Sequence, residues 1–132
     1  MSDAAINQLF AAYADALNDF DADAIVDLFA YPATVWQFGK GHVFSDREDL
    51  MDNVEALLSA FDGAGVVTSA CTIEMAEAPT GAGSAFASVL WTQDDAKGET
   101  VHEFRCGYLL VPDDGEWYIA SVINPAEDDT DQ

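Results

Sequence analysis

The spacing of hydrophobic residues changes half-way along the chain, and this change constrains the fold more than any other feature. Up to about residue 62, apolar side chains recur every three or four positions, as on one face of a helix. From about residue 66 they recur every second position, as in a strand. Helices followed by strands predict an α+β fold in which helices pack on one face of a sheet.

Three helices are expected in the first half of the chain. The first begins near Ser2, and its apolar face consists of Ile6, Leu9, Phe10, Tyr13 and Leu17. Asp21 is a suitable N-cap for a short second helix, whose buried residues would be Ile25, Leu28 and Phe29. Pro32 then ends the helix and starts an extended segment over residues 33–38.

A third helix follows a short strand at residues 42–44. The spacing of Ser45 and Glu48 fits a capping box, in which Ser45 is the N-cap. The sequence Asp62-Gly63 ends this helix. Its expected apolar face consists of Leu50, Val54, Leu57, Leu58 and Phe61.

Four strands are expected in the second half, at about residues 66–75, 84–92, 100–111 and 117–123. Short segments with glycine or proline separate them, and such short turns indicate antiparallel hairpins. Strands of about ten residues twist, so the sheet should curve around the helices and leave an apolar hollow at its open end. In the first of these strands, one face is expected to hold Val67, Ser69, Cys71, Ile73 and Met75.

The size and composition fit a single domain over residues 1–126, followed by an acidic tail over residues 127–132 that we expect to be disordered. The two cysteines, Cys71 and Cys106, lie in apolar strands and are expected to be reduced core thiols. No basic, apolar leader and no apolar window of roughly 18 residues is present, which favours a cytoplasmic protein. No spacing typical of metal ligands is present, and we expect neither a metal nor a cofactor.

The charge of the chain is strongly negative. Four Lys and Arg face 25 Asp and Glu, a formal net charge of -21. Such a surface repels phosphate backbones and anionic lipids, which argues against nucleic acid and membrane partners. A solvated acidic surface explains the charge most simply, whereas a salt-adapted host or a basic protein partner would explain it as well.

Stability is expected to rise with salt over the first few hundred millimolar. The negative charges repel one another in the folded domain, and counterions screen this repulsion beyond about 10 Å at 0.1 M salt. Thermal melts from low to moderate sodium chloride measure the effect. A melting temperature that stays constant or falls would show that the charges are already well spaced or paired.

The order of the expected elements, together with several sequence runs, resembles the nuclear transport factor 2-like superfamily, which is also called cystatin-like. The runs in the first half are similar to its ketosteroid isomerase and polyketide cyclase branch: residues 12–18, Asp21, residues 25–30 and residues 33–35. The run Gly115-Glu116-Trp117-Tyr118-Ile119 resembles the last strand of the family. The resemblance implies a cone-shaped fold, with three N-terminal helices packed on a curved, mostly antiparallel sheet.

The resemblance also implies positions for the isomerase catalytic groups. Tyr13 matches the tyrosine that donates a hydrogen bond to the oxyanion in that branch. The general base would fall at Gln37, which cannot accept a proton near neutral pH, and the protonated aspartate would fall at Gly107. One of three catalytic positions is kept, so we expect negligible steroid isomerase activity.

Other branches of the same fold suggest two further candidates. The epoxide hydrolase branch uses an arginine near Arg105, paired with acids that activate water, but Gly107 stands where an acid is needed. A Glu103–Arg105 pair on an exposed sheet face or dimer contact is the simpler interpretation. The dehydratase branch uses two histidines, whereas His42 and His102 are far apart in the sequence and His102 is out of register with Arg105.

Two functional hypotheses follow. The first is a small-molecule pocket protein, either a binding module or a lyase- or isomerase-like enzyme, acting on an apolar ligand with a carbonyl or hydroxyl group. The second is a non-catalytic structural or interaction domain whose pocket is filled by its own aromatic side chains. In either case large residues on both sheet faces predict a homodimer. The polar pocket residues of the first hypothesis would be Tyr13, Gln37, Arg105, Tyr118 and Asn124.

Overall fold

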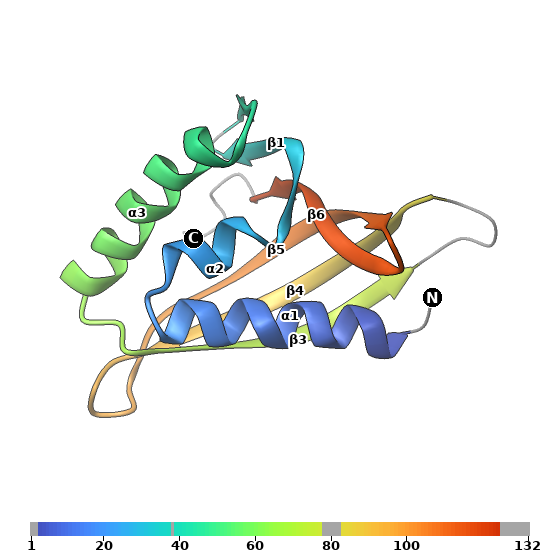
Figure 1. Ribbon diagram of the computed structural model, residues 1–132. Coiled ribbons are helices and arrows are strands. Elements are labelled where there is room, and N and C mark those ends of the chain that lie inside the picture. The colour runs from blue at the N-terminus through green and yellow to red at the C-terminus, as the bar shows by residue number, and fades with distance from the viewer. Residues whose placement is uncertain (1–2, 38, 78–82, 125–132) are drawn as a thin grey trace.

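The computed structural model describes residues 3–37, 39–77 and 83–124. Within these ranges the chain forms three helices and one six-stranded sheet (Figure 1). The predicted acidic tail at residues 127–132 lies outside the described residues. The elements are α1 (Asp3–Asn18), α2 (Ala22–Val26), β1 (Phe29–Gln37), β2 (Lys40–Phe44), α3 (Arg47–Gly63), β3 (Thr68–Glu77), β4 (Ala85–Asp94), β5 (Thr100–Asp113) and β6 (Glu116–Ile123).

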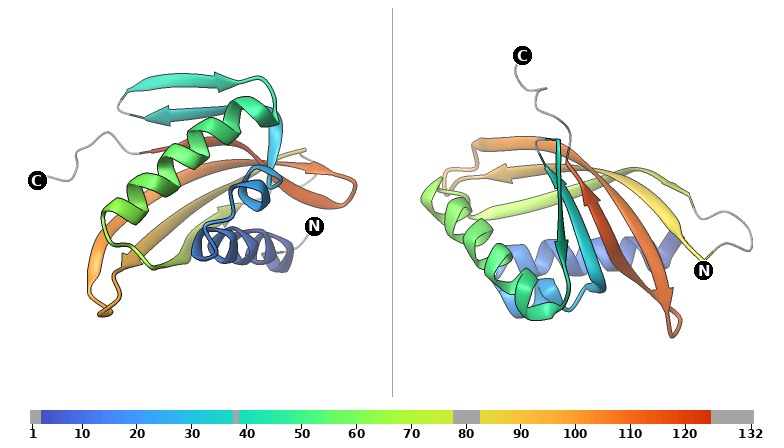
Figure 2. Two further views of the ribbon diagram at one scale, coloured as in Figure 1. Left: turned by 60° about the vertical axis from the view of Figure 1, so that its left-hand side comes forward. Right: turned by 90° about the horizontal axis from the view of Figure 1, so that it is seen from above.

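The sheet has the strand order β2-β1-β6-β5-β4-β3. Strands β3 to β6 form the expected antiparallel meander. The β1–β2 hairpin joins this meander through β1 and β6, which pair in parallel, so the sheet is mixed although mostly antiparallel. Both views in Figure 2 show long strands that twist and bend over the helices.

The helices contribute the expected apolar faces to a single core. All five predicted apolar residues of α1 are buried in the core. Helix α1 lies alongside β3 (Figure 1). In α3, Leu50, Val54 and Leu58 are buried. Leu57, on the same helix, is 38% exposed. None of the described helices combines the length and the apolar character that a membrane span requires.

Two predicted boundaries were wrong. Helix α2 ends at Val26, and Phe29 is the first residue of β1, which continues through Pro32. The strand tolerates this proline because the β1–β6 register shifts between Phe29 and Thr34.

The cap of α3 is Asp46 rather than Ser45. The Asp46 carboxylate accepts a hydrogen bond from the Asp49 amide at 2.9 Å. The Asp49 carboxylate accepts one in return from the Ser45 amide at 3.2 Å. The capping motif is therefore present one residue later than predicted, and aspartate caps a helix as well as serine does.

A bulge in β3 separates Met75 from the face that it was predicted to share with Ser69, Cys71 and Ile73. The β3–β4 register shifts between Ile73 and Met75. Before the shift, Ser69, Cys71 and Ile73 face the helices, whereas Met75 lies on the opposite face and is 41% exposed. One extra residue in a strand reverses the alternation of side chains, and for this reason the prediction for Met75 was wrong.

Candidate functional site

The interior beneath α1 is filled by aromatic side chains. The Tyr13 ring packs edge-on against Trp91, with ring centroids 5.3 Å apart, and Phe10 packs in the same way against Tyr108 at 4.9 Å. The Trp91 Nε1–H donates a hydrogen bond to the Tyr108 hydroxyl at 2.7 Å, so these two buried polar groups satisfy each other. The protein's own rings thus fill the space between α1 and the centre of the sheet.

Tyr13, the candidate pocket donor, lies inside this aromatic cluster. Its ring contacts Phe29 and Tyr108 as well as Trp91. Burial raises the pKa values of the Tyr13 and Tyr108 hydroxyls far above the ordinary value of a phenol. Both phenols are therefore neutral over the physiological pH range, and Tyr13 contributes to packing.

Gln37 and Asn124 lie at the ends of their strands. Gln37 lies on the same face of β1 as Val35, and its side chain is exposed. The Asn124 side-chain oxygen, Oδ1, accepts a hydrogen bond from the Cys106 thiol at 2.8 Å. The Asn124 backbone N–H donates one to the Trp36 backbone carbonyl at 2.9 Å.

Arg105 and Tyr118 lie on the outer face of the sheet, away from the helices. The Arg105 guanidinium donates two hydrogen bonds to the Glu74 carboxylate, at 2.7 and 3.1 Å, and it lowers the pKa of that carboxyl group. Arg105 thus pairs with Glu74 across the sheet rather than with Glu103. The Tyr118 hydroxyl donates to the Glu116 carboxylate at 3.3 Å. The five predicted site residues are therefore not brought together, and a ligand role for any of them stays a prediction.

Gly107 also faces outward, so the position matched to the protonated aspartate does not face the interior. The end of the Phe86 ring lies 3.0 Å from where a Cβ atom of residue 107 would be. A side chain at this position would displace the ring. Trp36 lies over Gly41 in the same way, at 2.8 Å from the corresponding Cβ position.

The two histidines lie on different strands. His42 is exposed on β2, whereas His102 on β5 contacts the buried Gln93, with the His102 Nδ1 and the Gln93 Oε1 3.0 Å apart. The Gln93 Nε2 donates in turn to the Ser69 hydroxyl at 3.1 Å. This chain of polar groups joins β5, β4 and β3, and it satisfies the buried amide of Gln93.

The outer face of the sheet carries a surface that we call the outer apolar face: Trp36, Val43, Met75, Phe86, Leu109 and Ile123. These are six of the nine large hydrophobic residues that are exposed in the described part of the chain, so the exposure is concentrated on one side. The strand register joins them: Phe86 pairs with Leu109, and Ile123 lies between Trp36 and Gly107. The sequence predicted large residues on both faces of the sheet. It did not predict that these six residues would lie together on one face.

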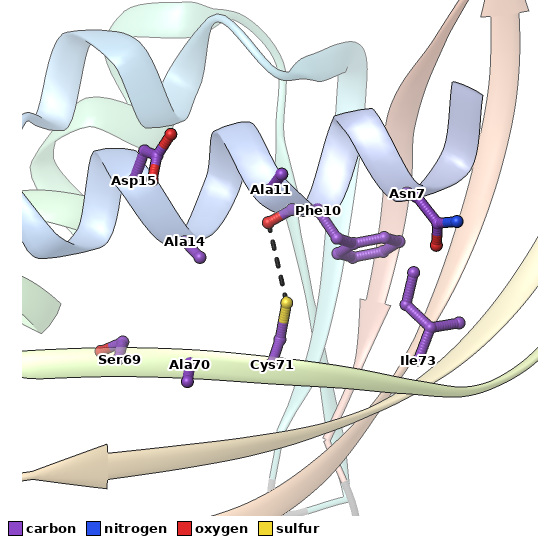
Figure 3. A pocket seen from close by; sticks show the side chains of 9 residues that line it. All are labelled: Asn7, Phe10, Ala11, Ala14, Asp15, Ser69, Ala70, Cys71 and Ile73. Carbon is purple, nitrogen blue, oxygen red and sulfur yellow. Dashed lines mark hydrogen bonds between the residues drawn. The ribbon is translucent and has the colours of Figure 1, made fainter. Parts of the chain in front are cut away.

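A groove of about 440 Å³ lies between α1 and β3 (Figure 3). None of the five predicted site residues lines it. The Cys71 thiol points across the groove to the Phe10 carbonyl, which accepts its hydrogen bond at 3.7 Å. Its lining residues are Asn7, Phe10, Ala11, Ala14, Asp15, Ser69, Ala70, Cys71 and Ile73.

Over residues 3–37, 39–77 and 83–124, no three His, Cys, Asp or Glu residues gather closely enough to hold an ion. The two cysteines are free, with Cys106 buried and Cys71 half-buried.

We expect the domain to lose stability in alkali through Cys106. Burial raises the pKa of its thiol from 9.0 to about 11, so the unfolded chain releases this proton earlier than the folded one. The stabilisation is complete below pH 9 and is lost as the pH rises towards 11, by roughly 2–3 kcal/mol. Urea unfolding of the wild type and of Cys106→Ala at a series of pH values measures the difference.

Cys106→Ala also controls for the buried tyrosines. Tyr13 and Tyr108 titrate above pH 10 in both proteins, so their effect on stability is common to the two. The decline between pH 9 and 11 should be shallower in Cys106→Ala. Equal declines in the two proteins would show that the thiol is not the group responsible.

Comparison with solved structures places this arrangement in a known fold. A cystatin-like domain of unknown function from Nostoc punctiforme is 18% identical, with a TM-score of 0.73, over 95% of this chain and 76% of that one. An NTF-2 like protein of unknown function from Shewanella oneidensis is 17% identical, with a TM-score of 0.72, over 93% and 98%. A ketosteroid isomerase-like protein from Erwinia carotovora atroseptica is 23% identical, with a TM-score of 0.66, over 91% and 92%.

These identities are low and establish the fold alone. A search of curated proteins found no match to the chain. A family model described as NTF2-like protein (DUF6841) matches residues 2–127, which is nearly the whole sequence. The chain therefore belongs to this family of NTF2-like proteins.

Proposed function

We propose that the protein is a non-catalytic interaction domain that associates through the outer apolar face, with a second copy of the chain as its partner. The observation that carries the proposal is the grouping of exposed hydrophobic side chains on the side of the sheet that the helices leave uncovered. Exposed apolar patches of this kind generally mark protein interfaces.

The filled interior supports a non-catalytic role. Trp91 and Tyr108 are both 2% exposed and hydrogen-bonded to each other, and the Tyr13 side chain of α1 packs against both rings. A ligand in this space would have to displace buried rings. The competing hypothesis, a small apolar ligand bound at Tyr13, therefore requires a rearrangement of the core that dimerisation through the outer sheet face does not.

Charge limits where a second copy of the chain can bind. The chain has only four basic residues, so two copies cannot offer each other opposite charges over a wide acidic surface. They can associate where charge is scarce, and the six residues of the outer apolar face are uncharged. An isologous pairing would use this same surface on both copies.

The Arg105–Glu74 pair lies on the same sheet face. It provides a basic and an acidic group in each copy. In an isologous dimer such groups can meet their opposites across the two-fold axis.

Sedimentation velocity at micromolar concentration tests the proposal. We expect a species of twice the 14.2 kDa chain mass, and we expect moderate salt to strengthen the association because it screens the repulsion between two acidic copies. A single 14 kDa species at every salt concentration would exclude the dimer.

A further inference from the structure

The free edge of β3 borders the groove beside α1. Strand β3 is the last in the sheet, and within the described residues it pairs with β4 alone. The Ser69 backbone N–H donates its hydrogen bond to the side chain of Asn18 at the end of α1. This N–H therefore points away from β4. Backbone groups of alternate residues in an antiparallel strand point to the same side. Cys71 and Ile73 therefore present their amide and carbonyl groups at the free edge.

This open stretch of edge is short and bounded at both ends. The Asn18 side chain caps it at Ser69, and the bulge between Ile73 and Met75 ends it at the other side. Caps and bulges are the usual means by which proteins block strand addition at an edge. Here they leave Cys71 and Ile73 open, with no hydrogen-bond partner at the free side within the described residues.

The groove provides room for side chains of an added strand. Its α1 wall carries the small residues Ala11 and Ala14, and Figure 3 shows the Ala14 side chain pointing towards β3. Phe10 and Ile73 add apolar surface, and the exposed carboxylate of Asp15 lies at one end. The groove thus combines small and apolar side chains along the edge with a negative charge at one end.

We propose that this groove binds an extended, basic peptide segment of another protein, which adds a strand to β3 at Cys71 and Ile73. Backbone hydrogen bonds to the free edge would provide affinity, as in other cases of strand addition. Small apolar side chains would fit against Ala11 and Ala14, and a lysine or arginine would reach Asp15. The net charge of -21 favours a basic segment over an acidic one and over a second copy of this chain.

A synthetic heptapeptide of sequence KTVAVTK, acetylated and amidated at its ends, is a suitable probe. Amide chemical shifts of the ¹⁵N-labelled full chain are recorded during titration, and hydrogen exchange is measured with and without the peptide. We expect shifts at Cys71 and Ile73, together with slower exchange of these two amides. The acidic peptide ETVAVTE should give no shifts, and salt should weaken binding of the basic one.

Two N-methylated versions of the basic peptide test the mode of binding. Each carries methyl groups on alternate backbone amides, so the two versions block opposite edges of the extended peptide. An added strand uses only one edge, and one version should fail to bind while the other binds. Equal binding of both, or equal failure, would overturn strand addition.

Two pairs of variants test the site. Ala11→Leu fills the groove, whereas Ala12→Leu places the same side chain on an exposed part of α1 outside the groove. Asp15→Asn removes the charge beside the groove, whereas Asp19→Asn removes one just beyond α1. We expect the first member of each pair to weaken binding by about tenfold, or 1.4 kcal/mol, and the second to have little effect.

The remaining outcomes decide against the proposal. Shifts confined to the outer apolar face would place the peptide at another surface. Cys71 and Ile73 amides that already exchange slowly without peptide would mean that the edge is occupied. Shifts at these amides that depend on protein concentration alone would identify a second copy as the occupant. The dimer through the outer apolar face is tested separately by Leu109→Glu, so the failure of one proposal can be distinguished from the failure of the other.

Discussion

Trp91→Ala is expected to lower the free energy of unfolding by about 3–5 kcal/mol. Trp91 is 2% exposed and packs against Tyr13, so its removal leaves a cavity at the centre of the aromatic cluster. The Tyr108 hydroxyl also loses its donor. Urea unfolding at one fixed protein concentration measures the change, with Leu57→Ala as the control.

The control residue is 38% exposed on α3, and its truncation should cost less than about 1 kcal/mol. Tyr108→Phe isolates the hydrogen bond, because it leaves the buried Trp91 N–H unpaired. We expect it to cost about 1–3 kcal/mol, less than the loss of the whole indole. Near-equal stability of Trp91→Ala and wild type would mean that the interior is not packed as described.

Added indole extends the same experiment to the question of function. A dry apolar cavity of the right shape binds small aromatic molecules, so indole should raise the melting temperature of Trp91→Ala. Wild type, whose own tryptophan occupies the space, should show no shift. A shift of equal size in wild type would indicate an open interior pocket and would favour the small-molecule hypothesis.

The overall architecture could be predicted from the spacing of apolar residues. The α1 face from Ile6 to Leu17 and the alternation in β4 and β5 are long and regular, so local pattern and burial agree. The boundary errors occurred where the pattern is short. Phe29 continues the three- and four-residue spacing from Ile25, and only its pairing with Ile119 on β6 shows that it belongs to a strand.

The candidate site was less predictable, because faces depend on register. Glu103, Arg105, Gly107 and Leu109 alternate along the sequence and share one face of β5, but alternation alone does not say which side the helices cover. The bulge at Ile73/Met75 likewise has no clear sequence signal. The groove beside α1 depends on where the β3 edge lies relative to the helix, a long-range relation that no local spacing encodes.

Leu109→Glu is expected to convert the proposed dimer to monomer. Leu109 lies opposite Phe86 near the middle of the outer apolar face. In an isologous dimer the substitution enters twice, and Arg105, the basic residue described on this face, already pairs with Glu74. We expect the dissociation constant to rise by more than about a hundredfold. Sedimentation velocity over a dilution series measures it.

Leu57→Glu is the matched control, since the substitution is the same and the exposed fractions are nearly equal, 38% for Leu57 and 37% for Leu109. Both variants add one negative charge to each chain, so general repulsion between acidic copies changes equally. Only Leu109 lies on the outer apolar face, and only Leu109→Glu should become monomeric at low micromolar concentration while keeping the melting behaviour of a folded domain. If both variants dissociate alike, net charge rather than this face governs association; if neither does, the copies meet elsewhere.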